Sequence, residues 1–513
     1  MNNMWNKNIY RSLLILSFLG VNTVIIYGIS SVWVYLNSGA DKSTILHVQG
    51  ETERTYLPEI QWGDLENPGR PMEAQTLKEL QNDYLRSWYV RNNALATNDP
   101  YGVADYYTDS MRIKLNKVLD LNKQHNTAVK QSSLVHHPSL DFYSADGGLV
   151  VFTDRQVEIY REIWQNEQLQ LKKKDTSSYK VMMLLEDGFW RIRHMVEIEE
   201  PNEEGQISEK NNISQFDIAK MKGLNYYPSK GPWDTFGVHF NKEIISKDFA
   251  QIGTMGLNSL RIFVPYEEFG KADVSNKNME KLTMLLDLAN IERLKVLVTL
   301  FDFYGNYDLM DWTLTHRHAE TIVKTLKGHP ALLGWDLKNE PDLDFESRGK
   351  EQVLAWLEEM SSKVKNWDPY HPVTIGWSSP EVANLLREKV DFISFHYYQD
   401  PSDFLGKYQA LEERVGDTPI LLGEYGYSSY SGMWNAFLGS EKKQAEYYKE
   451  MQRYLNDKGI PYLFWTLYDF SQVPNSVVGV LPWRKQRQKY FGAISIEDEK
   501  KPSYQYLDLS SQK

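Results

Sequence analysis

The spacing of hydrophobic residues divides the chain into three parts, and the first part is a single apolar run. Residues 12–36 contain no charged side chain and are rich in Leu, Ile and Val. A helix that crosses a bilayer needs about 20 apolar residues, whereas the core of a cleaved signal peptide has about 7–15. We therefore expect a membrane anchor at 12–36, with cleavage after Ala40 as the alternative. Lys7 and Arg11 precede the run, so residues 1–11 are expected in the cytoplasm and the rest of the chain outside it.

Between residues 76 and 200 the pattern predicts helices first and an antiparallel sheet afterwards. Apolar residues recur at helical spacing at Leu77, Leu80, Tyr84, Trp88 and Leu95. A second short helix is expected over 105–121, and apolar runs of strand length follow it, the last two joined by the hairpin signal Asp187-Gly188. Helices followed by such strands are typical of an α+β domain. The polar segments 37–75 and 201–221 are interpreted as linkers on either side.

This second part resembles the NTF2-like cone fold. The run Gly188-Phe189-Trp190-Arg191-Ile192 is similar to the start of the last strand of that fold. NTF2-like domains include enzymes as well as binding and scaffolding modules, so the resemblance implies no active site in residues 76–200. It implies instead a surface through which a protein partner could dock.

From residue 222 onward, apolar runs of strand length alternate with helical stripes. Eight strands are predicted, at Lys222–Tyr227, Ser259–Val264, Lys295–Leu300, Leu332–Leu337, Pro372–Gly376, Phe392–His396, Pro419–Gly423 and Tyr462–Leu467. Eight strand–helix units in residues 222–513 match the size of a (β/α)8 TIM barrel. An open doubly wound sheet has the same alternation, but no G-x-G-x-x-G motif follows the first strand to indicate a dinucleotide site. The predicted fold class is α/β, with a C-terminal (β/α)8 barrel after a small α+β domain and an N-terminal transmembrane helix.

Composition and charge narrow the range of functions. The net charge of −12, without a basic stripe, argues against a nucleic-acid partner. The absence of cysteine excludes disulfides, thiolate nucleophiles and Cys-ligated zinc. No carboxylate cluster accompanies His316 and His318 or the pair His136 and His137, so we expect no metal and no other cofactor. The many Trp and Tyr residues suit sugar stacking as well as core packing.

Polar residues end the predicted barrel strands, at the edge where TIM barrels carry their catalytic groups. The fourth strand leads into Asn339-Glu340-Pro341, and the seventh leads into Glu424. Other strands carry or precede Arg261, His396, Tyr398 and Trp465. Each of these residues alone has an ordinary explanation, such as core packing or a structural ion pair. Together they indicate two carboxylates that face each other across a sugar, the arrangement that glycosidic bond cleavage requires.

With these motifs, the chain resembles the clan of retaining glycoside hydrolases with (β/α)8 barrels, and above all glycoside hydrolase family 5, the cellulases and mannanases. The resemblance runs from Lys222 to Tyr506 and includes Phe491-Gly492-Ala493-Ile494 and Lys501-Pro502-Ser503-Tyr504. It implies that Glu340 is the general acid/base and that Glu424 is the nucleophile. It implies substrate-binding or orienting roles for Asn339, Arg261, His396, Tyr398 and Trp465.

The resemblance also implies a separate role for each of these residues. Asn339 would bond the sugar 2-hydroxyl, Arg261 and Tyr398 would orient Glu424, His396 would lie in the substrate site, and Trp465 would stack under the sugar. We expect the charge of Arg261 to lower the pKa of Glu424, and the negative charge of Glu424 to raise the pKa of Glu340.

One position departs from the family's pattern. Family 5 members usually carry a histidine near the end of the third strand, and residues 300–305 contain none. Asp302 or Tyr304 is expected to line that side instead. The departure does not affect the two glutamates, but it leaves the sugar undefined.

The leading interpretation is a membrane-anchored, extracytoplasmic retaining β-glycosidase that hydrolyses a polysaccharide or oligosaccharide by double displacement. A transglycosylase would use the same glutamate pair, with a sugar hydroxyl in place of water. A non-catalytic glycan-binding or assembly protein of a polysaccharide system is the third interpretation, and the intact glutamate pair counts against it. The absence of cysteine and the short basic N-terminus favour a bacterial envelope protein.

Overall fold

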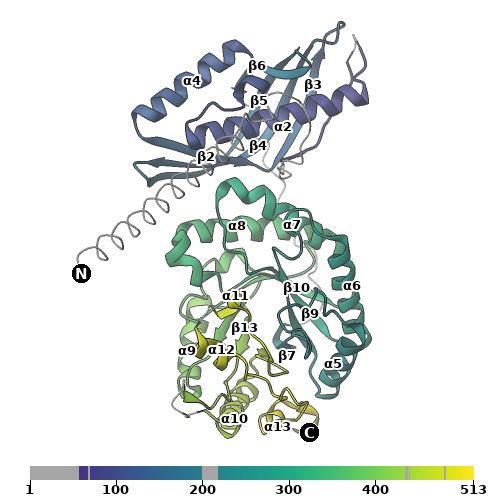
Figure 1. Cartoon of the computed structure of the whole chain (residues 1–513), viewed down its shortest axis with the longest axis vertical. Helices are drawn as coiled ribbons and strands as arrows, with labels where there is room; N and C mark the ends of the chain where they lie inside the picture. Colours follow the sequence, from purple (N-terminus) through teal and green to yellow (C-terminus); the bar gives the residue numbers. More distant parts are fainter. Residues whose placement is uncertain are drawn as a thin grey trace, which may run out of the picture. The chain divides into compact units, whose positions relative to one another are not determined.

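The computed structural model describes residues 57–67, 70–198, 218–433, 437, 439–478 and 481–512. The predicted membrane anchor at 12–36 lies outside these residues, as does much of the two predicted linkers. Within the described ranges, no helix is both long enough and apolar enough to cross a bilayer. The described chain comprises an N-terminal region, 57–198, and a C-terminal region, 218–512 (Figure 1).

The N-terminal region contains three helices, α2 (Ala74–Thr97), α3 (Val103–Tyr106) and α4 (Asp109–Gln124). The predicted stripe on α2 is confirmed for buried Leu80, Tyr84, Trp88 and Leu95. The helix expected over 105–121 is confirmed from Asp109 onward as α4, but its start is wrong, because the chain leaves the helical path between α3 and α4. There Tyr107 is extended and bridges Ile192, and the Thr108 N–H donates to the Ile192 carbonyl at 3.1 Å. Joining the sheet at this point interrupts the helix.

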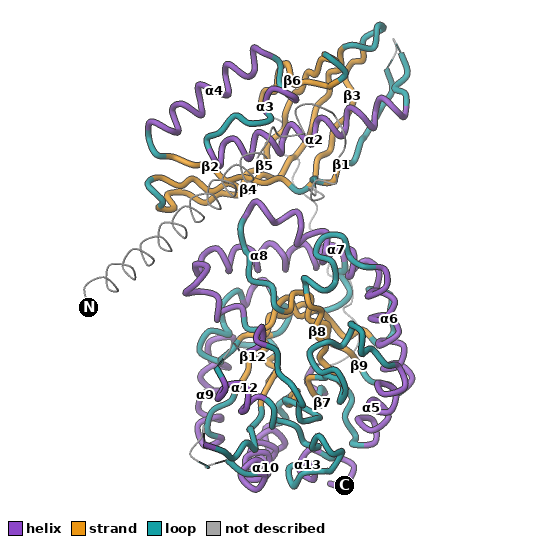
Figure 2. The backbone as a smooth tube through the Cα atoms, in the orientation of Figure 1, coloured by secondary structure: helices purple, strands orange, loops and turns teal. Residues whose placement is uncertain are grey.

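The helices accompany a mainly antiparallel sheet. Its strands are β1 (Glu59–Ile60), β2 (Thr127–Ser133), β3 (Val135–Tyr143), β4 (Leu149–Gln165), β5 (Gln168–Glu186) and β6 (Phe189–Ile198), ordered β1-β3-β4-β5-β6 with β2 also paired to β4. Strand β1 falls inside the predicted linker 37–75 and pairs in parallel with β3. Helix α2 contacts β2 and β6 and runs across one face of the sheet (Figure 2). The predicted hairpin is confirmed, since Glu186 pairs with Phe189 around two residues of positive φ.

The C-terminal region is a closed barrel of eight parallel strands. They are β7 (Lys222–Asn225), β8 (Ser259–Pro265), β9 (Lys295–Asp302), β10 (Leu332–Asn339), β11 (Val373–Trp377), β12 (Ile393–Tyr397), β13 (Ile420–Tyr425) and β14 (Tyr462–Phe464). Consecutive strands pair, and β14 pairs with β7 to close the barrel. Nearly every strand residue is buried, as expected when helices cover a parallel sheet. All eight predicted strands, and with them the predicted TIM barrel, are confirmed.

Helices surround the barrel (Figure 1). The long ones are α5 (Lys242–Thr254), α6 (Asn276–Ile291), α7 (Trp312–Leu326), α8 (Lys350–Trp367), α9 (Pro401–Val415) and α10 (Glu441–Lys458). The fully described connection from β11 to β12 has only a short 3-10 helix, η5 (Arg387–Lys389), in place of an α-helix. After β14 the chain forms three short helices, α11 (Asn475–Val478), α12 (Pro482–Gln488) and α13 (Tyr504–Leu507). Because all the strands are parallel, their carboxyl ends open on one side, where the candidate site lies.

Candidate active site

Glu340 directly follows β10 and has an uncommon backbone conformation. Its φ of 46° and ψ of 51° lie in the left-handed region, which few residues other than glycine adopt. Pro341 restricts the residue before it and disfavours the ordinary helical conformation at Glu340. The Glu340 N–H donates to the carbonyl of Gly376 at 2.7 Å, which ties this corner to β11. The Glu340 side chain, 26% exposed, lies at the barrel mouth.

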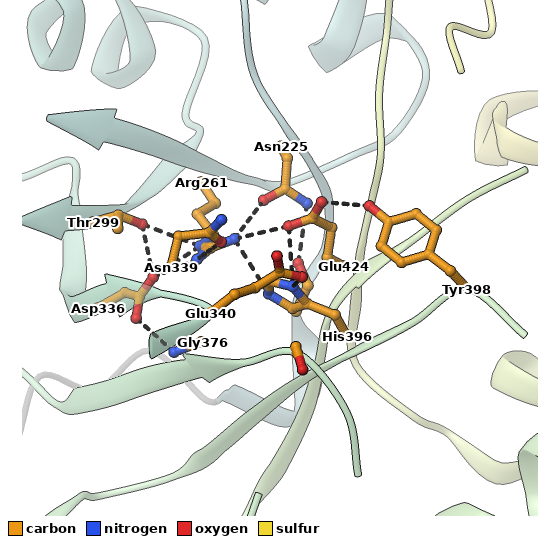
Figure 3. Close-up of polar contacts among 12 residues, drawn as sticks. Asn225, Arg261, Thr299, Asp336, Asn339, Glu340, Gly376, His396, Tyr398 and Glu424 are labelled. Atoms are coloured by element: carbon orange, nitrogen blue, oxygen red, sulfur yellow. Dashed lines mark hydrogen bonds and ion pairs between the residues drawn. The ribbon is translucent and has the colours of Figure 1, made fainter. Parts of the chain in front are cut away.

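Glu424 lies within β13 and is almost fully buried. Its Oε2 accepts a hydrogen bond from Arg261 Nη1 at 3.2 Å, and its Oε1 accepts a short hydrogen bond from the Tyr398 hydroxyl. Arg261 belongs to β8 and Tyr398 follows β12, so three separate strands fix this carboxylate (Figure 3). A side chain held by partners on rigid strands keeps one geometry without a substrate present.

His396 joins the two carboxylates. Its Nδ1 lies 2.8 Å from Glu340 Oε1 and 3.4 Å from Glu424 Oε2. Because both oxygens contact the same nitrogen, their separation cannot exceed the sum of these two distances. The histidine, on β12, has a fully buried side chain, and Figure 3 shows it beside the two glutamates.

Arg261 is completely buried and is shared among several acceptors. Its strongest partner is Asp336 on β10, whose Oδ2 accepts from Nε at 2.9 Å and from Nη2 at 2.6 Å. Nη2 also donates to Asn339 Oδ1 at 2.9 Å, and Nη1 donates to Asn225 Oδ1 at 3.2 Å. The guanidinium therefore compensates the charge of Asp336 first and that of Glu424 second.

Gly376 makes room for this guanidinium. A Cβ atom at position 376 would lie 2.6 Å from Arg261 Nη2, closer than non-bonded atoms approach. The Gly376 N–H also donates to Asp336 Oδ1 at 2.9 Å. Glycine is thus required at this position of β11 because Arg261 leaves no room for a side chain, and not because of its backbone angles.

Sequence reasoning missed three partners of Arg261, namely Asp336, Asn225 and Thr299, whose Oγ1 bonds both the guanidinium and Asp336. A signal for one of them was present. Asp336 is the sole charged residue in the apolar run 332–337, and a buried carboxylate needs a cation nearby. Arg261 is likewise the charged residue in an otherwise apolar strand, so an ion pair between Arg261 and Asp336 could have been predicted. Asn225 and Thr299 carry no comparable signal.

A cavity of about 470 Å³ opens above these groups. It is lined by Glu340, Glu424, Asn339, Tyr398 and Trp465, by Tyr227, Trp233, Phe263, Phe303 and Phe491, and by Asp302, Val477, Val478, Arg484, Arg487 and Gln488. Trp465 packs against Tyr227 and Trp233, with ring centroids 5.8 and 5.6 Å apart. The aromatic surface and the two carboxylates face one space, which suits a sugar ring with one apolar face and several hydroxyls.

All seven site residues predicted from the sequence lie together at this end of the barrel, in two layers. Glu340, Glu424, Asn339, Tyr398 and Trp465 line the cavity. Arg261 and His396 lie beneath it, buried and bonded to the carboxylates, and are not among the lining residues. Of the two replacements expected for the absent strand-three histidine, Asp302 lines the cavity and Tyr304 packs in the core.

The pKa shifts of the two glutamates oppose the expectation from the sequence. Burial raises the pKa of Glu424, and the negative charge of Glu340 adds to that rise, more than His396, Arg261 and Tyr398 offset. Burial also raises the pKa of Glu340, but the hydrogen bond and charge of His396 outweigh it and lower the pKa overall. The reason is geometric, because Asp336 takes most of the charge of Arg261 and His396 lies closer to Glu340.

Asp302 lines the same cavity, and among the described residues its carboxylate forms no ion pair. Burial raises its pKa to about 6, although the positive charges of Lys338 and Arg261 act against the rise. Its Oδ2 accepts a long hydrogen bond of 3.4 Å from the Tyr227 hydroxyl.

Among the described residues, no group of three or more His, Asp or Glu side chains is arranged to hold a metal ion. Three of the histidines singled out in the sequence have ring nitrogens in contact with protein groups. His316 Nδ1 contacts the Trp312 carbonyl at 2.6 Å, and both ring nitrogens of His318 contact backbone carbonyls. His136 bonds a buried carboxylate in the N-terminal region.

The barrel matches a known family. Residues 222–471 match the model for cellulase, glycosyl hydrolase family 5, and this span contains all eight barrel strands. The barrel of this chain is a glycoside hydrolase family 5 domain.

Curated relatives are similar to parts of the chain. Human β-glucuronidase is 25% identical over 289 residues, which are 52% of this chain and 42% of that protein. Mannan endo-1,4-β-mannosidase 7 of Oryza sativa subsp. japonica is 37% identical over 148 residues, 21% of this chain and 38% of that protein. The chain thus spans less than half the length of these relatives. A GH5_18 protein from Streptomyces cattleya, solved in complex with GlcNAc, is similar with a TM-score of 0.46 and 15% identity, over 57% of this chain and 79% of that one.

Proposed function

We propose that this protein is a retaining glycoside hydrolase that cleaves O-glycosidic bonds in a β-linked polysaccharide or oligosaccharide. The contact of both carboxylates with one nitrogen of His396, at 2.8 and 3.4 Å, carries the proposal. Contact with one shared nitrogen holds the two carboxylates close together, which is compatible with the roughly 5–5.5 Å between the carboxyl groups of retaining enzymes, where no water has to fit between them. Membership of family 5 supports the same conclusion.

In the first step, Glu424 attacks the anomeric carbon and Glu340 gives its proton to the departing glycosidic oxygen. The carbon–oxygen bond to the leaving sugar breaks as the bond to Glu424 forms, giving a covalent glycosyl-enzyme. Arg261 and the Tyr398 hydroxyl hold the two oxygens of Glu424, so the attacking carboxylate does not rotate away. In the second step, Glu340 takes a proton from water, which attacks the same carbon and releases Glu424.

The substrate must also redistribute the proton between the glutamates. In the substrate-free site, His396 favours the ionised form of Glu340, while burial favours the protonated form of Glu424. A glycosidic oxygen that accepts a hydrogen bond from Glu340 draws this side chain away from His396. Glu340 then loses the contact that lowers its pKa, and the proton moves to the position that acid catalysis needs.

The remaining cavity groups supply substrate contacts in this proposal. The Asn339 Oδ1 is held by Arg261, which leaves the amide NH2 as the donor for a sugar hydroxyl. Trp465 offers an aromatic face beside the glutamates. The curated relatives include β-mannosidic and β-glucuronidic enzymes, which supports a β-linked substrate here.

The test combines a substrate screen with covalent trapping. The full chain is assayed on β-linked glucans, mannans, xylans and amino-sugar polymers, and a 2-fluoro glycoside is used to trap the intermediate for peptide mass spectrometry. We expect turnover that Glu424→Ala abolishes, and a label on Glu424. A label on another residue would overturn the assigned roles, and glycan binding without any turnover would favour the non-catalytic interpretation. An added acceptor sugar distinguishes transglycosylation, because it would appear in the product.

The proposal places the enzyme at a membrane, held by residues 12–36, with its barrel outside the cytoplasm. The length and lack of charge of that run support this placement. The helices and antiparallel sheet of residues 57–198 are proposed to form an NTF2-like module that docks a protein partner. Membrane fractionation followed by protease treatment of intact cells tests the placement, and a soluble or protected barrel would contradict it.

A further inference from the structure

The chain after β14 is locally basic although the protein as a whole is acidic. Residues 471–496 contain no Asp or Glu but include Arg484, Lys485, Arg487 and Lys489, within a chain of net charge −12. Four cations in six positions without a compensating carboxylate are not needed for solubility, which the acidic remainder already provides. The segment lies in the last loop of the barrel, on the face that carries the glutamates.

Two of these cations face the cavity. Arg484 and Arg487 line it together with Glu340 and Glu424, and Gln488 extends the same wall. Helix α12 spans Pro482–Gln488, so positions 484, 487 and 488 share one face of it. Lys485 and Lys489 belong to the same stretch but do not line the cavity. The two arginines therefore differ from the two lysines in position, since only the arginines face the cavity.

The two guanidinium groups lack acidic partners. In the part of the chain that the structure describes, neither Arg484 nor Arg487 forms an ion pair, and both side chains are exposed. Lys485, in contrast, has its Nζ bonded to the side-chain oxygen of Asn475. Among the cavity's carboxylates, Glu340 contacts His396 and Glu424 contacts Arg261 and Tyr398, while Asp302 forms no ion pair with either arginine among the described residues. The charge on this wall thus remains available to a ligand.

We propose that Arg484 and Arg487 bind an anionic group on the substrate, so that the enzyme acts on acidic glycans whose sugars carry a carboxylate or a sulfate ester. Guanidinium groups donate in a planar fork that matches two oxygens of such a group. A neutral sugar has no charge to pair with two arginines. This inference rests on the proposed function, because it names the substrate class of the same cavity.

Binding to three matched β-1,4-linked oligosaccharides tests the inference. One is neutral, the second carries C6 carboxylates and the third carries C6 sulfates, and titration calorimetry uses the Glu424→Gln chain so that none is consumed. We expect a charged oligosaccharide to bind about 10- to 100-fold more tightly than the neutral one at low salt. The preference should shrink as the salt concentration rises. Preference for the carboxylate or for the sulfate identifies the anion.

Two double variants locate the effect. Arg484→Gln with Arg487→Gln should reduce the charged-to-neutral preference to near one, whereas Lys485→Gln with Lys489→Gln removes the same charge from the same stretch and should retain it. Arg487→Lys keeps the charge without the fork and should give an intermediate preference. Thermal melting checks that each variant is folded.

The inference is overturned if no charged oligosaccharide is preferred, or if the arginine variant keeps the preference, or if the lysine variant loses as much of it. Its failure is distinguishable from failure of the proposed function. A label on Glu424 without any charge preference overturns only the inference. A charge preference without turnover of any glycan overturns only the hydrolase proposal.

Discussion

Each of the two regions of this protein contains a histidine bonded to a carboxylate, yet the two hydrogen-bond networks have different consequences for the protein. In the N-terminal region, His136 Nδ1 contacts Asp154 Oδ2 at 2.6 Å, and its Nε2 contacts Ser133 Oγ at 2.9 Å. In the barrel, His396 Nδ1 contacts Glu340 Oε1 at 2.8 Å. The N-terminal network contains the more familiar set of residues, because Ser, His and Asp in this order of contacts form the catalytic triad of many hydrolases.

The two networks differ in whether a substrate can reach them. Ser133 and His136 are at most 1% exposed, and Asp154 is completely buried, so no substrate atom can reach the hydroxyl. Asp154 has further donors in the Tyr84 hydroxyl at 2.6 Å and the His137 N–H at 2.8 Å, which complete its hydrogen bonding. Glu340, by comparison, has an exposed edge on a cavity. A saturated network stabilises a fold, and an unsaturated one at a cavity is free to bind and react.

The largest effect expected is on catalysis at the barrel. Glu424→Gln removes the attacking carboxylate while keeping its shape, so kcat should fall by at least about 10⁴-fold. Initial rates on the substrate identified by the screen measure it. Glu346→Gln, which changes an exposed glutamate in the loop after β10, is the matched control and should retain activity. A loss below about tenfold would mean that another group performs the attack.

The corresponding change in the N-terminal network should affect stability and spare the chemistry. Asp154→Ala leaves the buried donors of Tyr84 and His136 and the backbone N–H of His137 without their acceptor, and the free energy of unfolding should fall by about 3–5 kcal/mol. Urea unfolding followed by far-UV circular dichroism measures it. Glu79→Ala, on the exposed side of α2, should cost no more than about 0.5 kcal/mol. If Asp154→Ala abolished the activity of folded protein, the network would not be purely structural.

A third variant concerns Asp302, a buried carboxylate that lines the cavity and, among the described residues, forms no ion pair. Its pKa is about 6 when folded against an ordinary value of 3.8, so protein stability falls as pH rises between these values. Above pH 6 the folded state carries the full cost of the buried charge, about 3 kcal/mol, and below 3.8 it carries none. Asp302→Asn should therefore gain up to about 3 kcal/mol over the wild type between pH 4 and pH 7. Unfolding curves at both values test this, and a constant difference would contradict it.

The smallest effect is expected at Tyr398. Tyr398→Phe removes one hydrogen bond to Glu424 and leaves that of Arg261, so kcat/KM should fall about tenfold with an unchanged melting temperature. The pH profile of kcat/KM should also shift upward on the limb that reports Glu424, because the lost bond favours its ionised form. An unshifted profile would indicate that Tyr398 contacts the sugar only.

The barrel was predictable because its strands are buried on both faces and read as apolar runs, interrupted at their ends by polar residues. The glutamate pair and its shell were predictable for the same reason, since parallel strands bring their carboxyl ends together. What the pattern could not give is the sharing of Arg261 between Asp336 and Glu424, which depends on side-chain geometry inside the barrel. The pKa directions expected for Glu340 and Glu424 were reversed because burial raises the pKa of Glu424 and the contact with His396 lowers the pKa of Glu340.

Two other features escaped the sequence for different reasons. The break between α3 and α4 arises because Tyr107 and Thr108 bond a strand about 85 residues later in the chain, and local periodicity carries no record of such a partner. The arginines of the cavity wall lie in the seven-residue helix α12, which is too short to show an apolar period, so only the structure places them beside the glutamates. The sequence shows that these residues are charged, but it does not show that they face the cavity.

Gly376 has a consequence for how mutations in this barrel should be read. It has no side chain and is not among the residues that line the cavity, yet any side chain at this position would collide with Arg261. Replacing it by alanine is therefore an indirect change to the arginine, transmitted by volume to the carboxylates on both sides. Among variants that lose activity, a methyl group at this position should be as damaging as the removal of a charge. A survey restricted to residues with reactive side chains would overlook it.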